Sequence, residues 1–271
     1  MNTPTYTLKN IKKEYKNFCL NIPEFNIPVG FSIALIGENG AGKTTLLNIL
    51  KKQIENNGFV SSTCFFNPSW TLNHVAKISP LLFESFDKKK FKNLCTIQEL
   101  WDMNKNIEHF STGMKMKAML AATLSRDTDI LLLDEPASSL DPVSREELCN
   151  LIRDYINNNG KTEKTVLFST HNISDMENVT DYAIIMNNGE IIEEGFVDEL
   201  KEKYILIKGE ALDAHKLGKY LFGFSKNSFG CQGLCEASDL DKLAGFNIEI
   251  ETPTLNQISV GIMKKYSVFK I

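Results

Sequence analysis

The stretch GENGAGKTT, residues 37–45, constrains the fold more than any other part of the sequence. It matches the pattern G-x-x-x-x-G-K-[ST], and it lies between the apolar run FSIALI and the helix-like run LLNILKK. The glycines let consecutive backbone N–H groups converge on phosphates, and the positive end of the following helix points at the same place. The order strand, loop, helix therefore predicts an α/β fold of the P-loop NTPase type with a nucleotide phosphate site.

Each position of this loop has an expected role. We expect Lys43 to reach the β- and γ-phosphates, Thr44 to offer its hydroxyl to Mg²⁺, and Thr45 to add a phosphate contact. The nucleotide contacts expected from the loop are Gly37, Glu38, Asn39, Gly40, Ala41, Gly42, Lys43, Thr44 and Thr45.

Composition narrows the class of protein. The 271 residues are 42% hydrophobic and 24% charged, which predicts one large domain or one domain with a small appendage. A net charge of −4 argues against general nucleic-acid binding, where a basic face is expected. The chain has no apolar run of about 18 residues and no signal-peptide core at its N-terminus, so a cytoplasmic protein is expected.

The six cysteines are scattered and contain no CxxC pair, which predicts reduced thiols. Cys231 and Cys235 could form a redox or metal pair, but no further Cys or His lies near them. Ordinary cytosolic thiols are the favoured interpretation.

Two acidic residues end a short apolar run in DILLLDEPASSLDP, residues 129–142. Residues 130–133 are expected to form a buried parallel strand, and ligand chemistry in open α/β sheets lies at the carboxyl ends of such strands. Asp134 is the candidate Mg²⁺ partner, and Glu135 the residue that orients or deprotonates the attacking water. Without the upstream loop, a solvated strand end would be the better interpretation.

A second polar strand end follows in KTVLFSTHNISD. Residues 166–169 are expected to be a buried strand, with His171 at its end, where the γ-phosphate would lie. A lone histidine is more often structural, and the other three histidines of the chain have no such placement.

Three small residues, Ser111, Thr112 and Gly113, directly precede a helix that is expected from Met114 onward. A plain helix cap explains them in isolation, although the helix N-terminus can also face an anion. Since the chain already has its own phosphate loop, a second anion-ready helix start indicates contact with a nucleotide held by another copy.

In this order, the motifs resemble the nucleotide-binding subunit of an ABC transporter. GENGAGKTT resembles the Walker A loop, STGMK the signature loop, ILLLDEP the Walker B strand, SSLD with Asp141 the D-loop, and His171 the switch histidine. Tyr15 matches the aromatic residue that stacks on adenine, although a core tyrosine on the first strand is about as plausible. The resemblance covers roughly residues 5–205.

This resemblance implies ATP and Mg²⁺ as cofactors and ATP sandwiched between two subunits, with a homodimer favoured over a heterodimer. It also implies an integral membrane permease as partner, no nucleic acid, and a peripheral location on the inner face of the cell membrane. A soluble ABC-type ATPase in translation or DNA repair is the alternative, and a P-loop kinase for small molecules would leave STGMK and His171 unexplained.

Finer variants of the motifs are similar to a bacterial exporter branch. Thr112 stands where many members carry glycine, and the segments LDPVSREEL and FSTHNISDMENVTDYAIIMNNGEIIEEG are similar to that branch as well. The branch includes antimicrobial-peptide, bacteriocin and lantibiotic immunity systems, so export of a peptide, antibiotic or lipid-like substrate is expected.

One segment departs from the family. Residues 54–69 are short where members carry a longer excursion followed by a glutamine-bearing loop, and they contain no glutamine. Asn67 is the expected equivalent and the third candidate near Mg²⁺, although its side chain is one methylene shorter.

The chain divides into an ABC ATPase domain, residues 1–205, and a small α+β extension, residues 206–271. A helical subdomain is expected at about 72–125, with helical spacing in residues 79–94 and 96–103. Its large apolar residues are expected mostly in the core, with some exposed member receiving the membrane subunit: Phe83, Phe86, Phe91, Leu94 and Trp101. In the extension, helices are expected at 211–222, 238–244 and 254–266, the last capped by Thr254, with a strand at 247–251.

Overall fold

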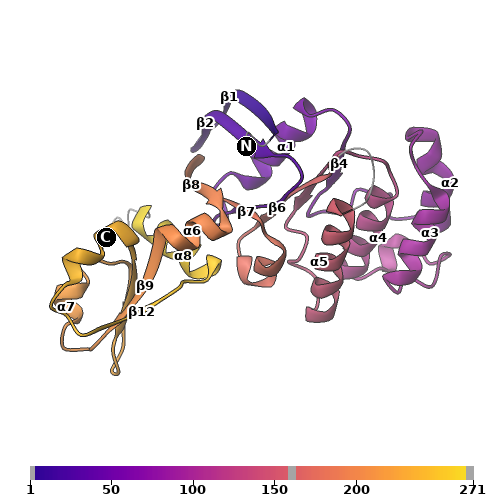
Figure 1. Ribbon diagram of the computed structural model, residues 1–271. Helices are drawn as coiled ribbons and strands as arrows, with labels where there is room; N and C mark the ends of the chain where they lie inside the picture. Colours follow the sequence, from indigo (N-terminus) through magenta and orange to yellow (C-terminus); the bar gives the residue numbers. More distant parts are fainter. Residues whose placement is uncertain (1–3, 158–162, 267–271) are drawn as a thin grey trace.

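The computed structural model describes residues 4–157 and 163–266. Residues 1–3 and 267–271, the outer ends of the two expected domains, lie outside these ranges. Helices α2 and α3 and the C-terminal extension lie at opposite ends of the molecule (Figure 1). No helix within the described ranges is long and apolar enough to cross a membrane.

A six-stranded sheet forms the centre of the described chain, with strand order β4-β5-β6-β3-β7-β8. Neighbouring strands are parallel except at the β7–β8 edge. The strands are β3 (Ser32–Ile36), β4 (Asn57–Val60), β5 (Ile130–Asp134), β6 (Thr165–Thr170), β7 (Tyr182–Asn187) and β8 (Glu190–Phe196). The expected buried strands at 130–133 and 166–169 are confirmed, since every residue of β5 and β6 is buried.

Alternate residues of the strands face two apolar layers. Ile33 and Leu35 of β3 belong to one core, together with α1 (Lys43–Gln53) and the hairpin of β1 (Thr5–Tyr15) and β2 (Phe18–Pro28). Ala34 and Ile36 face the other core, which α4 (Thr112–Leu124) and α5 (Pro142–Ile156) help to form. This layered α/β arrangement agrees with the expected P-loop NTPase fold.

The helical subdomain differs in detail from the expected spacing. Its helices are α2 (Leu72–Leu82), α3 (Lys88–Ile97) and α4, with a 3-10 turn, η1, at Ile107–His109. The run at 79–94 is broken because Asp87 caps α3, accepting from the backbone N–H groups of Lys89 and Lys90. A helix over 96–103 is wrong: α3 ends at Ile97, and Glu99 has a left-handed φ of 59°.

The large apolar residues of the subdomain fall into a buried group and an exposed group, as expected. Phe86, Phe91 and Leu94 are buried, whereas Phe83 is 39% and Trp101 is 69% exposed.

The extension is a four-stranded sheet of order β10-β11-β9-β12 in the described residues. Its elements, which follow α6 (Val197–Lys203), are β9 (Tyr204–Gly209), α7 (Ala214–Leu217), β10 (Phe222–Lys226), β11 (Cys231–Glu236), η4 (Ala237–Leu243) and β12 (Ile248–Glu251). Cys231 and Cys235 are buried free thiols in its core, in agreement with the ordinary interpretation.

Two expectations for the extension are corrected. The helix over 211–222 reduces to α7, because strand β10 begins at Phe222, where Gly223 has a φ of 60° and its backbone lies close to Gly261. The helix expected at 238–244 is instead the 3-10 element η4. The strand near 247–251 and the last helix are confirmed as β12 and α8 (Leu255–Tyr266).

Helix α8 returns from the extension to the larger part of the molecule, which carries the phosphate loop. Thr254 caps it, since its hydroxyl accepts from the backbone N–H of Gln257 at 3.1 Å. The Glu177 carboxylate accepts from the backbone N–H groups of Leu255 (2.8 Å) and Asn256 (3.4 Å). At the other end of the helix, Asn187 Nδ2 donates to the Tyr266 carbonyl at 3.3 Å. The helix thus holds the extension against the domain that carries the phosphate loop.

Candidate nucleotide site

A cavity of about 760 Å³ opens at the carboxyl ends of the central strands. The phosphate loop forms its floor, and Glu135 stands at one side. The lining residues are Tyr15, Asn17, Phe18, Glu38, Asn39, Gly40, Ala41, Gly42, Lys43, Thr44, Thr45, Glu135, Asn187 and Asn188. Eight of the nine loop residues expected at the phosphates, Glu38 to Thr45, therefore share one cavity.

The loop conformation requires glycine at specific positions. Gly40 and Gly42 have φ values of 89° and 107°, in the region that favours glycine. A Cβ at Gly42 would lie 2.8 Å from the Phe18 ring, and a Cβ at Gly37 would lie 2.7 Å from the Met186 carbonyl oxygen. Helix α1 begins directly after Gly42 without a side-chain cap, so its first N–H groups are available to an anion.

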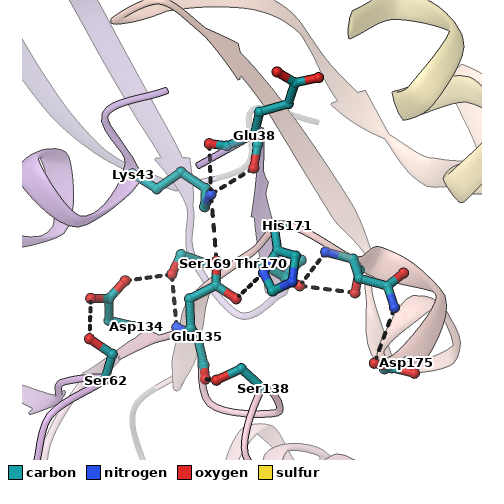
Figure 2. Close-up of polar contacts among 12 residues, drawn as sticks. Glu38, Lys43, Ser62, Asp134, Glu135, Ser138, Ser169, Thr170, His171 and Asp175 are labelled. Atoms are coloured by element: carbon teal, nitrogen blue, oxygen red, sulfur yellow. Dashed lines mark hydrogen bonds and ion pairs between the residues drawn. The ribbon is translucent and has the colours of Figure 1, made fainter. Parts of the chain in front are cut away.

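Lys43 is almost fully buried beneath the loop. Its Nζ donates to the carbonyl oxygens of Gly37 (2.6 Å) and Glu38 (3.2 Å) and lies 3.5 Å from Glu135 Oε1 (Figure 2). Burial lowers the pKa of Lys43, while the nearby carboxylates of Glu135 and Asp134 raise it in part. The ammonium group is thus held between two carbonyl oxygens of the loop and the Glu135 carboxylate.

Asp134 is buried at the end of β5 and accepts hydrogen bonds from three elements. The Thr44 hydroxyl from α1 lies 3.0 Å from each carboxylate oxygen. The hydroxyl of Ser169 on β6 donates to Oδ1 at 2.7 Å, and Ser62 after β4 donates to Oδ2 at 3.4 Å. Mg²⁺ in nucleotide sites commonly takes one carboxylate, substrate phosphates and water, so the paired hydroxyl and carboxylate of Thr44 and Asp134 fit it.

Glu135 and His171 come together although 36 residues separate them. Glu135 Oε2 lies 2.8 Å from His171 Nδ1, and the Glu135 backbone N–H donates to the Ser169 hydroxyl at 2.9 Å. Glu135 has a left-handed φ of 50°, a conformation that costs free energy and recurs at functional sites. The structure thus brings three expected residues, Lys43, Glu135 and His171, to one place (Figure 2).

The signature residues lie at a different helix end. Ser111 is exposed and caps α4 by accepting from the backbone N–H of Met114 at 3.1 Å. A Cβ at Gly113 would lie 3.1 Å from the Ser139 carbonyl oxygen, so the segment expected as the signature loop borders the one expected as the D-loop. Neither Ser111, Thr112 nor Gly113 is among the described residues that line the cavity.

Asp141 has a capping role at α5. Its carboxylate accepts from the backbone N–H groups of Val143 and Ser144 and from the Ser144 hydroxyl. These hydrogen bonds, that of the hydroxyl foremost, lower the pKa of Asp141. Asp141 also lies outside the described cavity lining.

Tyr15 ends β1 at the cavity rim and is 54% exposed. Its ring centroid lies 6.2 Å from that of Phe18, so two aromatic faces border the space above the loop. The exposure of Tyr15 excludes the alternative of a core tyrosine. Phe18 was missed by sequence reasoning, because no motif distinguishes it from other aromatic residues of the chain.

Asn67 is the one metal candidate that the structure places elsewhere. Its Oδ1 accepts from the backbone N–H (3.0 Å) and hydroxyl (2.8 Å) of Ser69, which closes a local turn on the surface. From the same segment, Ser62 contacts Asp134 instead. Sequence reasoning missed Ser62 and Ser169; a serine inside the apolar run of β6 was the available signal for Ser169.

The sequence is similar to those of known proteins. A family model described as ABC transporter matches residues 20–138. The lantibiotic transport ATP-binding protein SrtF of Streptococcus pyogenes is 31% identical over 212 residues, which cover 68% of this chain and 88% of that protein. The ABC transporter ATP-binding protein NatA of Bacillus subtilis (strain 168) is 28% identical over 221 residues, or 72% and 86% of the two chains.

Solved structures agree at the level of the fold. A dimeric ATP-binding cassette in a post-hydrolysis state, bound to ADP and Pi, matches with a TM-score of 0.60 and 23% identity. The match covers 70% of this chain and 97% of that one.

Proposed function

Because the chain belongs to the family of ABC transporter ATP-binding proteins, we propose that it hydrolyses ATP as one half of a dimer and drives export through a separate membrane subunit. The observation that carries this proposal is the position of Glu135, between the Lys43 ammonium and the His171 ring at the edge of the phosphate cavity.

ATP binds with its phosphates on the loop N–H groups and Lys43, and with its adenine against Tyr15. Thr44 and Asp134 would hold Mg²⁺, which neutralises phosphate charge when bound. Ser169 and Ser62 orient the Asp134 carboxylate by donating to it.

Glu135 is the proposed general base. Its carboxylate takes a proton from a water molecule whose oxygen forms the new bond to the γ-phosphorus. The bond from the γ-phosphorus to the β–γ bridging oxygen breaks, and ADP and phosphate leave. His171 contacts the γ-phosphate and holds the Glu135 carboxylate, while Lys43 stabilises the charge of the phosphate oxygens.

The second subunit completes the site. The N-terminus of α4, with Ser111, Thr112 and Gly113, faces the γ-phosphate of the ATP that the partner's loop holds, and Asp141 of the D-loop lies beside it. A homodimer is favoured because Glu135, Ser111 and His171 are all present in this chain. Removal of the γ-phosphate breaks the contact between subunits, so hydrolysis reopens the dimer.

The membrane subunit is proposed to dock in a groove of about 510 Å³ between the central sheet and the helical subdomain. Exposed apolar side chains of α2 and its C-terminal turn border it, with Leu82 66% and Phe83 39% exposed. This docking would place the chain on the inner face of the membrane. Similarity to SrtF, a lantibiotic transport protein, supports export of a peptide-like substrate.

The test is ATP turnover by the purified protein as a function of its concentration, with Glu135→Gln as control. We expect a specific rate that rises with concentration and an ATP-trapped dimer in the variant. A flat specific rate together with a variant that stays monomeric in ATP would refute the dimer mechanism for the isolated chain.

A further inference from the structure

The groove proposed as the docking site has an unbalanced charge. Its described lining is mostly apolar and aromatic, and it includes two cations, Lys51 and Arg126, but no aspartate or glutamate. The helices and strands that contribute to its lining are α1, β4, α2 and α4 (Figure 1). Arg126 lies two residues after the end of α4 at Leu124.

Arg126 lies in this groove without a carboxylate partner among the described ion pairs. Its guanidinium carbon lies 3.9 Å from the centroid of the Phe83 ring, and Nη2 donates to the Asn57 carbonyl oxygen at 3.2 Å. Its Nε is buried with no hydrogen-bond partner in the described residues. Burial lowers the pKa of Arg126, because the charged form is partly removed from water.

Neighbouring acids are already engaged. Asp127, the next residue, lies 2.8 Å from Lys164 Nζ, and Asp129 lies 3.5 Å from the same nitrogen. Lys51, at the end of α1, has its Nζ 4.4 Å from the centroid of the Phe59 ring. Both cations of the groove thus rest on aromatic faces, which attract a cation but leave its charge uncompensated.

Arg126 is half-buried and Lys51 is exposed, so the cost of an uncompensated charge falls mainly on Arg126, and a carboxylate that binds there would relieve it. Between apolar walls the attraction is stronger than in water, and a guanidinium group can bind both carboxylate oxygens. A partner helix that carried a lysine in place of this carboxylate would be repelled by the two cations.

We propose that this groove selects a membrane-subunit helix that presents one acidic side chain within an apolar face, and that Arg126, with Lys51, binds that side chain. The inference rests on the proposed docking function and adds the chemistry by which the partner is recognised.

The experiment uses three hydrocarbon-stapled helical peptides with the same leucine face and a central Glu, Gln or Lys. Trp101→Phe in the full-length chain leaves Trp70, which lines the groove, as the only tryptophan. Quenching of Trp70 fluorescence then reports binding. The test variants in this background are Arg126→Gln and Arg126→Gln/Lys51→Gln, and the matched control is Lys92→Gln, an exposed lysine of α3.

We expect the Glu peptide to bind about tenfold more tightly than the Gln peptide, with the Lys peptide weakest. The preference should fall to less than about twofold in the double variant and persist in Lys92→Gln. Equal binding of the Glu and Gln peptides, no binding of any peptide, or a preference that survives the double substitution would overturn the inference.

ATP turnover of the same preparations separates the two proposals. Normal ATP turnover together with no preference for the Glu peptide would refute the recognition of an acidic side chain but leave the proposed ATPase function intact. Absent turnover in the unmutated chain, at any concentration, counts against the proposed function.

Discussion

Replacing Ser169 by alanine should impair both catalysis and folding, because its hydroxyl joins the two acidic residues of the site. The hydroxyl donates to Asp134 at 2.7 Å and accepts from the backbone N–H of Glu135 at 2.9 Å. Ser169 is fully buried. Ser169→Ala therefore leaves the Glu135 N–H unpaired and removes one of the donors to Asp134.

The magnitude follows from these contacts. A hydrogen bond to a charged group contributes about 1.5–3 kcal/mol, and an unpaired buried N–H costs about 1–3 kcal/mol. Asp134 keeps its hydrogen bonds from Thr44 and Ser62, so the loss should lie at the low end of the sum, about 3 kcal/mol. Substitution of a residue that orients a metal-binding carboxylate typically lowers activity by about 10- to 100-fold, and we expect kcat of Ser169→Ala to fall by that factor.

Ser32 provides a matched control on the neighbouring strand. It is also a buried serine, on β3, but its hydroxyl has no hydrogen-bond partner in the described ranges. Ser32→Ala removes an unsatisfied polar group, so the free energy of unfolding should stay unchanged or rise by about 1 kcal/mol. Urea unfolding gives the stability of both variants, and steady-state ATP hydrolysis gives kcat.

Equal effects of the two substitutions would refute the reasoning, because they would show that loss of a buried hydroxyl matters and its partners do not. Normal kcat in Ser169→Ala would refute the claim that Ser169 positions the acidic pair.

Three further predictions concern other parts of the chain. Glu177→Ala should lower the free energy of unfolding by about 2 kcal/mol, because it removes the carboxylate that accepts hydrogen bonds from the first turn of α8. Lys201→Gln removes only the partly exposed ion pair with Glu177 and should lower it by less than about 1 kcal/mol; urea unfolding measures both. Gly42→Ala should abolish binding of a fluorescent ATP analogue because its Cβ would meet the Phe18 ring, while Gly40→Ala, whose Cβ meets nothing within 4 Å, should keep more of it; equal losses would contradict the steric argument. Burial raises the pKa of Cys95 to about 12, so at pH 9 its thiol stays protonated and iodoacetamide should modify the exposed Cys19 first, as mass spectrometry can establish; early modification of Cys95 in the folded protein would contradict its burial.

The parts of the site that the sequence predicted are those carried by local patterns. The phosphate loop needs glycines at fixed offsets. Asp134 ends an apolar strand, and Glu135 and His171 each directly follow one, so their meeting at one sheet edge follows from parallel pairing of β5 and β6. The parts that it did not predict depend on contacts between distant segments. Ser62 contacts Asp134 across 72 residues, and no local pattern distinguishes its serine from that of a surface turn.

The extension was harder to predict for a similar reason. Residues 211–222 contain apolar residues at helical spacing, but Phe222 pairs with Leu234 of β11, and tertiary pairing overrides local propensity. The last helix was predictable because its cap, Thr254, and its apolar face are adjacent in sequence.

Helix α8 has a consequence for the order in which the chain folds during synthesis. Its residues Leu255 and Ile258 share a core with Ile173 and Met176, and the hydrogen bond from Leu255 to Glu177 spans 78 residues. After Phe196 has been made, the ribosome must still add residues 197–266, which takes roughly 4–14 s at about 5–20 residues per second. During that interval the nascent larger domain carries an uncovered apolar strip that includes Ile173 and Met176, a surface that a chaperone can bind.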